Sequence, residues 1–378
     1  MSQAFVLSYW NLNEAATGGV RRVNALLDAI GKNVVLCQPG PPHPVYDTAC
    51  LPRDWGRRKS GINWGLFNFF RLANAALVRQ VVAERHPAVI VLTSIWTFFP
   101  LRRLRGIPLV LDAHDVLAAA MEERYGAKHP FTLIVAAWER RVARRMDHLF
   151  TCSEADRARF ISRYQVPADR VSVVPNGVEV SAHDRADLSK APPAVASALG
   201  TARVLFFMGK LSYEPNARGL AFLNDDLMPE LERRAPGRYK LVVTGGPAPP
   251  RRMHPSIVFA GAVSDAELAA LMKRADICLS PTFSGGGTRL KILEYMAARK
   301  PVVTTPKGME GLECLNGREL VVADAEHFPD AVEDLVRNPA RAQALADAAH
   351  RLVTTCYDWT TSIRPLWRKG LSPWVACG

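Results

Sequence analysis

The sequence lacks most of the features that mark a secreted, membrane-spanning or zinc-binding protein. Its seven cysteines are scattered without a close Cys-x-x-Cys pair, which argues against a disulfide framework and a structural zinc site. The longest apolar run, residues 89–101, is interrupted by polar residues and Pro100 and is too short to cross a bilayer. The first residues lack a basic leader and a long apolar core, so we expect no signal peptide. These absences predict a cytoplasmic protein with free thiols.

Signals for nucleic-acid binding are also missing, although the chain is basic. The formal net charge is +12, and such a surface can attract nucleic acid, an anionic membrane or a phosphorylated substrate. The sequence has no zinc finger, no RNA-binding signature and no basic run interleaved with aromatic residues, so we expect no nucleic acid partner. The densest basic segment, residues 139–145, is typical of an amphipathic helix. Its basic face is either simply solvated or in peripheral contact with an anionic membrane on the cytoplasmic side.

Short β-branched runs alternate with longer helical patterns along the 378 residues, which predicts a parallel α/β architecture in two domains. The expected strands are residues 4–8, 33–37, 89–92, 109–112, 148–152, 171–174, 204–208, 240–244, 257–259, 277–280, 301–305 and 319–322. The expected helices are residues 20–29, 66–84, 132–145, 154–163, 217–231, 265–274, 288–298, 328–337 and 339–355. We interpret residues 53–62 as a mobile loop and Pro192-Pro193 as part of a linker. The domains are therefore expected at residues 1–185 and 186–355.

A run of three glycines before a predicted helix is the most informative segment. The run is Gly285, Gly286 and Gly287, and the helix that begins at Thr288 carries Lys291 and Glu294. Glycines let backbone N–H groups approach an anion closely, and the first turn of a helix leaves N–H donors unpaired. Lys291 adds a full positive charge, and Glu294 can accept hydrogen bonds from hydroxyls such as a ribose diol. The segment therefore predicts a site for a nucleoside diphosphate and its sugar.

Further motifs follow one another in a characteristic order along nearly the whole chain. They are Thr17-Gly18-Gly19, Asp112-Ala113-His114-Asp115, Cys152-Ser153-Glu154, Val174-Pro175-Asn176-Gly177, Met208-Gly209-Lys210, Phe259-Ala260-Gly261-Ala262-Val263 and the run 275–303. In this order the chain resembles the retaining glycosyltransferases of family 4, which have the GT-B fold. The resemblance implies two Rossmann-like parallel-sheet domains that face a central cleft. The acceptor side is the first domain, the donor side is the second, and residues 356–378 cross back to the first.

The resemblance also implies roles for individual residues. The expected catalytic residues are His114, Lys210, Lys291 and Glu294, of which His114 contacts the transferring sugar and Lys210 the diphosphate. The expected donor-binding residues are Gly18, Gly19, Gly209, Asn216, Gly245, Gly261, Val263, Gly285, Gly286, Gly287 and Thr288.

Two positions depart from the family pattern. Gly286 stands where the first of two paired glutamates is usual, so backbone amides would hold the donor sugar there. Asn216 stands where a second basic side chain is usual for the phosphates, and Lys291 can supply the missing charge from the facing helix.

Simpler structural explanations exist for several of these residues. They are a surface i,i+3 ion pair for Lys291 and Glu294, an N-cap role for Asn216, and tight turns for Gly18-Gly19 and Thr244-Gly245-Gly246. In contrast, Arg21 and Arg22 in the first turn of their helix disfavour an isolated helix but favour a bound anion.

The activity implied by the resemblance is transfer of a sugar, with retention, from a UDP- or GDP-hexose type donor to a hydroxyl of a glycan or lipid-linked acceptor. The sequence has no Asp-x-Asp motif, and cationic side chains can stabilise a leaving diphosphate in place of a metal. We therefore expect no metal and no cofactor besides the nucleotide sugar itself. Two alternatives remain open. One is a catalytically silent subunit that binds nucleotide sugars, and the other is a nucleotide-sugar epimerase, which the missing carboxylate at Gly286 disfavours.

Overall fold

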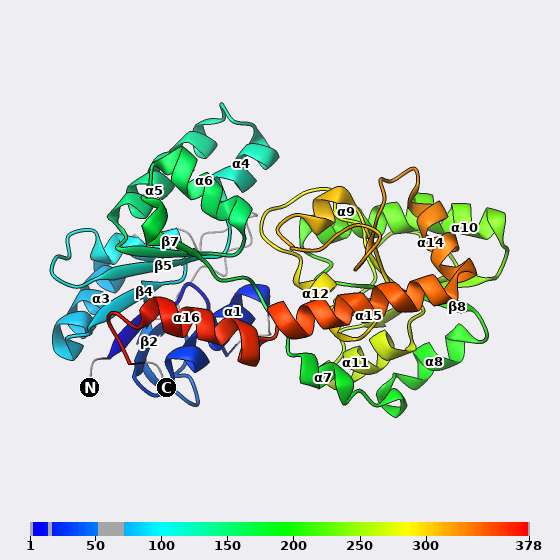
Figure 1. Ribbon diagram of the computed structural model, residues 1–378, viewed down its shortest axis with the longest axis horizontal. Coiled ribbons are helices and arrows are strands. Elements are labelled where there is room, and N and C mark those ends of the chain that lie inside the picture. Colours follow the sequence, from blue (N-terminus) through cyan, green and yellow to red (C-terminus); the bar gives the residue numbers. More distant parts are fainter. Residues whose placement is uncertain (1–2, 14–16, 52–71, 377–378) are drawn as a thin grey trace. The chain divides into compact units, whose positions relative to one another are not determined.

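The computed structural model in Figure 1 describes residues 3–13, 17–51 and 72–376. The chain divides into two compact units, and the first combines residues 1–176 with residues 363–378. The second unit is formed by residues 177–362. The expected loop at residues 53–62 lies outside the described residues. Within the described part, no helix combines the length and the apolar character needed to span a bilayer.

Within its described residues, the first unit contains a sheet of seven parallel strands in the order β3-β2-β1-β4-β5-β6-β7. The strands are β1 (Ala4–Leu7), β2 (Val34–Pro39), β3 (Asp47–Leu51), β4 (Val89–Leu92), β5 (Leu109–Ala113), β6 (His148–Thr151) and β7 (Val171–Val173). The helices are α1 (Gly18–Ile30), α3 (Leu72–Arg85), η1 (Ile95–Leu101), α4 (Leu117–Tyr125), α5 (Pro130–Arg145), α6 (Glu154–Tyr164), η2 (Ala168–Arg170) and α16 (Arg364–Leu371). The strand order reverses between β1 and β4, where open α/β sheets bind their ligands.

The second unit contains a sheet of six parallel strands among its described residues, in the order β10-β9-β8-β11-β12-β13. The strands are β8 (Arg203–Met208), β9 (Tyr239–Thr244), β10 (Ile257–Gly261), β11 (Ile277–Ser280), β12 (Val302–Thr304) and β13 (Val321–Val322). Its order reverses between β8 and β11, so a second ligand-binding edge is expected where these two strands end.

The helices of the second unit surround this sheet. They are α7 (Val180–Asp184), η3 (Leu188–Lys190), α8 (Pro193–Leu199), α9 (Glu214–Phe222), η4 (Leu223–Leu227), α10 (Met228–Arg234), α11 (Asp265–Arg274), α12 (Leu290–Ala297), α13 (Pro306–Met309), α14 (Phe328–Arg337) and α15 (Pro339–Cys356). A π-helical turn, η5 (Trp359–Ile363), lies at the junction with the last part of the chain.

Apolar strands explain why both sheets are buried on two faces. In β8, Val204 and Phe206 belong to one hydrophobic cluster, whereas Leu205 and Phe207 belong to another. Successive side chains of a strand point to opposite faces, so a continuous apolar run fills a core on each side. This is why the strands were predicted well from sequence.

The boundary between the units lies earlier than the predicted boundary after residue 185. Asn176 is held in the first unit by a hydrogen bond from Arg22 to its Oδ1. The N–H of Val178, only two residues later, donates to the carbonyl of Tyr357 in the second unit. Gly177 is required between them, because a Cβ there would lie 2.7 Å from Trp359 and from the Tyr357 carbonyl oxygen.

Two helix assignments also differ from the prediction. Pro192-Pro193 was interpreted as a linker, but Pro193 is the first residue of α8, a position that tolerates proline because no N–H is needed there. The helix expected at residues 217–231 begins at Glu214 and continues through η4 into α10.

The C-terminal helix is an integral part of the first unit. Figure 1 shows α16 beside α1, with which it is in contact. A Cβ on Gly370 would lie 2.4 Å from the ring of Phe150 on β6, so the helix packs more closely than any larger residue allows. The return to the first unit was expected from residue 356, whereas residues 356–362 belong to the second unit.

Candidate functional site

The second unit places the predicted lysine and the glycine run at the point where its strand order reverses. Gly209 and Lys210 follow β8, and the glycine run follows β11 and leads into α12. The side chain of Lys210 is exposed. Residues that follow these two adjacent strands converge at the carboxyl edge of the sheet, as expected for a ligand-binding edge.

Lys291 is held in this edge by a hydrogen bond and an aromatic ring. Its Nζ donates to Oδ1 of Asn216 at 2.7 Å and lies 4.4 Å from the ring centroid of Phe207. Burial, and then the nearby charge of Arg289, lower the pKa of Lys291 from its ordinary value to about 7. A bound anion would stabilise the charged form of this lysine, because its ammonium group has lost much of its hydration.

Asn216 links Lys291 to the segment after β8. Its Nδ2 donates to the backbone oxygen of Lys210 at 3.0 Å, while its Oδ1 accepts from Lys291. The N-cap interpretation of Asn216 was wrong, because α9 begins at Glu214 and its N-cap residue is Tyr213. A Cβ on Gly209 would lie 2.7 Å from Nδ2 of Asn216, which explains the glycine at that position.

The glycine run is organised by an arginine that the sequence analysis did not single out. The guanidinium of Arg289 donates to the carbonyl oxygens of Gly285 at 2.6 Å, Gly286 at 2.6 Å and Gly287 at 3.0 Å. In a trans peptide the N–H of the next residue points opposite to the carbonyl. The N–H groups of Gly286, Gly287 and Thr288 are therefore directed away from the guanidinium. This is the orientation that an anion cradle needs.

The left-handed backbone of the run requires glycine at two positions. Gly285 has φ +99° and Gly287 has φ +71°, values that other residues adopt only with strain. A Cβ on Gly285 would also lie 3.2 Å from Pro215 at the start of α9. The run therefore lies against the same helix that presents Asn216 to Lys291.

Glu294 does not pair with Lys291, so the surface ion pair considered above was wrong. Its Oε2 lies 2.6 Å from Nε2 of His183 on α7, and both side chains are almost completely buried. Nothing in the sequence indicated this contact, because the two residues are far apart in the chain and His183 lies in no recognised motif.

The glycines that follow β8 and β9 form backbone hydrogen bonds with neighbouring strand ends. Gly245 donates its N–H to the carbonyl of Gly261 and accepts from the N–H of Leu211. Gly209 donates its N–H to Thr244. A Cβ on Gly245 would lie 2.2 Å from the carbonyl oxygen of Gly209, so both glycines bring neighbouring strand ends close together. Their hydrogen bonds fit the strand-ending turn considered for Gly245.

Gly261 and Val263 lie at the next strand end along this edge. Gly261 ends β10 with φ +72°, and no neighbouring atom lies within 4 Å of the place where its Cβ would be. Val263 is half-buried in the short segment between β10 and α11. The conformation of Gly261, rather than crowding, is therefore what favours glycine there.

The first unit presents a second group of predicted residues where its own strand order reverses. Thr17 caps α1 by accepting from the N–H of Val20, which leaves Gly18 and Gly19 in the first turn. A Cβ on Gly19 would lie 2.8 Å from the indole of Trp10. Trp10 in turn stacks on His114, with ring centroids 4.6 Å apart and planes inclined by 24°. Trp10 thus joins the glycines of α1 to His114 at the end of β5.

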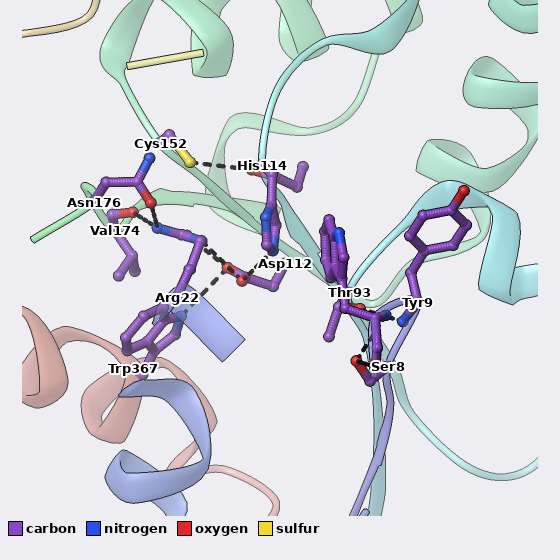
Figure 2. Close-up of polar contacts among 12 residues, drawn as sticks. Ser8, Tyr9, Arg22, Thr93, Asp112, His114, Cys152, Val174, Asn176 and Trp367 are labelled. Carbon is purple, nitrogen blue, oxygen red and sulfur yellow. Dashed lines mark hydrogen bonds and ion pairs between the residues drawn. The ribbon is translucent and has the colours of Figure 1, made fainter. Parts of the chain in front are cut away.

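Asp112 is the anionic centre behind His114, as Figure 2 shows. The carboxylate is fully buried and accepts two hydrogen bonds from Arg22, at 2.9 and 2.6 Å. Nε2 of His114 lies 3.4 Å from Oδ2 of Asp112, and Nε1 of Trp367 on α16 donates to Oδ1 at 3.4 Å. Burial alone would raise the pKa of Asp112, but Arg22 and then His114 hold it at about 2.

The role expected for Arg22 was therefore wrong. Its charge is neutralised by Asp112, and its remaining donors bind Val174, Pro175 and Asn176. A fully buried arginine that is paired in this way cannot also serve a bound anion. Arg22 instead joins α1, β5 and the end of the first unit (Figure 2).

The structure thus gathers the predicted residues into two groups, one in each unit. Within the described residues, no cluster of three or more His, Cys, Asp or Glu side chains could hold a metal ion.

Models of known protein families match both halves of the chain. Residues 17–182 match the model described as Glycosyltransferase Family 4, and residues 202–338 match the model described as Glycosyl transferases group 1. The matched residues include both site groups.

Curated relatives are similar over part of their length. Glycogen synthase of Mycobacterium tuberculosis is 28% identical over 239 residues, which cover 60% of this chain and 54% of that protein. The MMP alpha-(1->4)-mannosyltransferase of Mycolicibacterium hassiacum is 24% identical over 271 residues, which cover 67% of this chain and 62% of that protein. The chain therefore spans less than two thirds of the length of either relative.

Solved structures share the fold over their whole length. Sucrose-phosphate synthase from Thermosynechococcus elongatus has a TM-score of 0.76 at 17% identity, covering 99% of this chain and 100% of that chain. Anabaena HepE in complex with UDP and glucose has a TM-score of 0.73 at 14% identity, with the same coverage. These similarities confirm the expected class of two Rossmann-like parallel-sheet domains.

Proposed function

Because this chain belongs to the glycosyltransferases of family 4, we propose that it transfers a sugar from a nucleoside diphosphate sugar to a hydroxyl group of an acceptor. The observation that carries the proposal is the hydrogen bond of 2.7 Å from Nζ of Lys291 to Oδ1 of Asn216, at the strand edge where Arg289 also orders the glycine run. A half-buried lysine and backbone amides that point away from Arg289 would form a site for the diphosphate of a donor.

The reaction breaks the bond between the anomeric carbon and the diphosphate oxygen, and a new bond forms from that carbon to the acceptor oxygen. Negative charge develops on the departing diphosphate, where Lys291, Lys210 and the amides of the glycine run would stabilise it. We propose that the acceptor oxygen attacks the anomeric carbon from the face that the diphosphate leaves, which gives retention, and that the leaving phosphate takes the proton of the acceptor hydroxyl. These cationic groups supply the charge that a metal supplies in other transferases, so we also propose a metal-independent reaction.

His114 is the group of the first unit that we assign to the transferring sugar. Stacking on Trp10 fixes the plane of its imidazole, and Asp112 lies beside Nε2. Asp112 is itself held by Arg22 and Trp367. The family resemblance gives the role of His114, and these contacts supply the orientation that the role requires.

Transfer of labelled sugar tests the proposal directly. The protein is incubated with labelled UDP- and GDP-sugars, with and without a glycan or lipid extract as acceptor. We expect a labelled product, with turnover reduced on the order of 10²-fold in Lys291→Ala and Lys210→Ala. Lys300→Ala is the matched control. Lys300 precedes β12 at the amino ends of the strands, and its Nζ donates to the carbonyls of Lys273 and Ala275, which precede β11.

The same assay separates the alternatives. Unchanged turnover in both variants would reject the site. An isomerised donor formed without acceptor would identify an epimerase. Donor binding without transfer to any extract would identify a silent binding subunit.

We also propose that the acceptor lies at an anionic membrane surface, which α5 contacts. Three apolar side chains near the start of α5 are exposed, Phe131 by 36%, Leu133 by 57% and Ile134 by 65%. Exposed basic residues flank them in the chain, with Arg124 and Lys128 before the helix and Arg140, Arg141 and Arg144 further along it. Exposed apolar side chains together with basic residues on the same segment favour the interface of an anionic bilayer. This surface, the α5 patch, makes a lipid-linked or membrane-held acceptor the better supported class.

A further inference from the structure

His183 contacts a residue of the donor site although no motif includes it. It lies on α7, and its Nε2 is 2.6 Å from Oε2 of Glu294 on α12. The side chains of His183 and Glu294 are only 6% and 12% exposed. A carboxylate so deeply buried needs hydrogen-bond donors, because its charge has lost most of its water.

The direction of this hydrogen bond follows from the chemistry of the two groups. An ionised carboxylate can only accept, so Nε2 of His183 carries the proton and donates it to Glu294. Nδ1 of His183 is buried and has no hydrogen-bond partner among the residues that the structure describes. Within that part of the chain, the only hydrogen bond of the imidazole is thus the one to Glu294. The imidazole is therefore oriented by Glu294 and not by a wider network of hydrogen bonds.

Glu294 lies where a carboxylate can reach the ligand next to its diphosphate. It follows Lys291 by three residues on α12, a spacing that places both side chains on the same face of the helix. If Lys291 holds the diphosphate, the group beside it on the nucleoside side is the ribose, whose diol offers two hydroxyl donors. The orientation of Glu294 then decides whether it can accept from them.

We propose that His183 is a positioning residue that orients Glu294 to accept hydrogen bonds from the ribose diol of the nucleotide. The inference rests on the proposed function, since it requires a nucleoside diphosphate in the second unit. His183 acts through Glu294 and does not itself contact the ligand. The contact therefore contributes to the choice of a ribonucleotide over a deoxyribonucleotide.

Calorimetric titration with UDP and 2′-deoxy-UDP tests the inference, or with the guanosine pair if GDP binds more tightly. We expect the wild-type protein to bind the ribonucleotide on the order of tenfold more tightly, since hydrogen bonds to charged groups are the stronger ones. His183→Phe keeps a planar ring without the donor and should lose this preference. His183→Gln places an amide N–H near the position of Nε2 and should restore it.

The matched control is His350→Phe. His350 is a buried histidine on α15 whose Nδ1 contacts the carbonyl of Ala297, the last residue of α12, and not Glu294. This variant should keep the ribose preference. A second test uses Glu294→Ala, which by itself should abolish the preference for the ribonucleotide. Adding His183→Phe to Glu294→Ala should then change nothing further, because the two residues act as a unit.

The outcomes separate the inference from the function on which it rests. A wild-type protein that binds neither nucleotide overturns the proposed function and the inference with it. A wild-type protein that binds and prefers the ribonucleotide, together with a His183→Phe variant of unchanged preference, overturns the inference alone. Failure of His183→Gln to restore the preference also overturns it, because the role assigned to His183 is donation of an N–H.

Discussion

Lys291 is fixed by two contacts, the hydrogen bond from its Nζ to Asn216 and the face of the Phe207 ring. The glycine run next to it was enough to predict a charged contact with phosphate. Its direct partner, Asn216, was expected at the phosphates but not as a support for Lys291, because the two lie on different helices. Arg289 was missed for a similar reason, since its hydrogen bonds go to backbone carbonyls that have no signature in sequence. Local patterns therefore pointed to Lys291 and the glycine run but not to the side chains that hold them.

The lowered pKa of Lys291 predicts how donor binding depends on pH. In the free protein Lys291 loses its proton as the pH rises through about 7. A bound diphosphate favours the charged ammonium, so binding above that pH must take up a proton. We expect the dissociation constant for a nucleotide sugar to be nearly constant below pH 7. Above it, the constant should rise by up to about tenfold per pH unit.

Calorimetry in buffers of different ionisation enthalpy checks this prediction. A nucleotide sugar is the right ligand, because its diphosphate is esterified at both ends and does not itself titrate in this range. Proton uptake should approach one per binding event near pH 8 and should vanish in Lys291→Met. An affinity that stays constant from pH 6 to 8.5 would contradict the assignment.

At the scale of elements, the strands were easier to predict than the helix ends. A continuous apolar run such as β8 is recognised as a strand from sequence alone. In contrast, β3 (Asp47–Leu51) was missed, because it lies at the edge of its sheet and most of its residues are partly exposed. The start of α12 was placed at Thr288, two residues early, because the glycine run and Arg289 extend further before the helix begins. The terminal N–H and C=O groups of a helix often find their hydrogen-bond partners in residues that only folding brings near. Sequence patterns therefore locate helix ends less accurately.

The α5 patch gives a prediction at the same scale. Two charges placed among its apolar side chains, Leu133→Glu with Ile134→Glu, should weaken binding to phosphatidylglycerol-containing vesicles by more than tenfold. Transfer or donor hydrolysis in solution should stay unchanged, because the patch is distinct from both site groups. Vesicle co-sedimentation at low and moderate salt measures the effect.

The control for this experiment is Leu315→Glu. Leu315 is 59% exposed in the second unit and has no exposed apolar neighbours of comparable size in sequence. This variant should bind vesicles as the wild-type protein does. Equal binding by the double variant and the wild type would argue against α5 as the contact surface.

At the scale of the whole molecule, the same sheet arrangement occurs in both units. Each unit is a parallel sheet whose order reverses once, and each reversal carries one group of site residues. The alternation of strands and helices was enough to predict two such units. The return of the chain to the first unit was predicted, but from residue 356 rather than residue 363. The boundary at residue 177 and the contact between His183 and Glu294 were not predicted, because each depends on residues far apart in sequence.

The central claim is that the second unit holds a nucleoside diphosphate through Lys291, and thermal unfolding in the presence of ligands tests it most directly. UDP, GDP and ADP are compared on the wild-type protein, Lys291→Met and the control Lys300→Met. A bound ligand stabilises the folded state by about 2.7 kcal/mol at a hundredfold excess over its dissociation constant. We expect one of these nucleotides to raise the Tm of the wild-type and Lys300→Met proteins by several degrees and to leave the Tm of Lys291→Met unchanged. No shift with any nucleotide, or an equal shift in Lys291→Met, would contradict it.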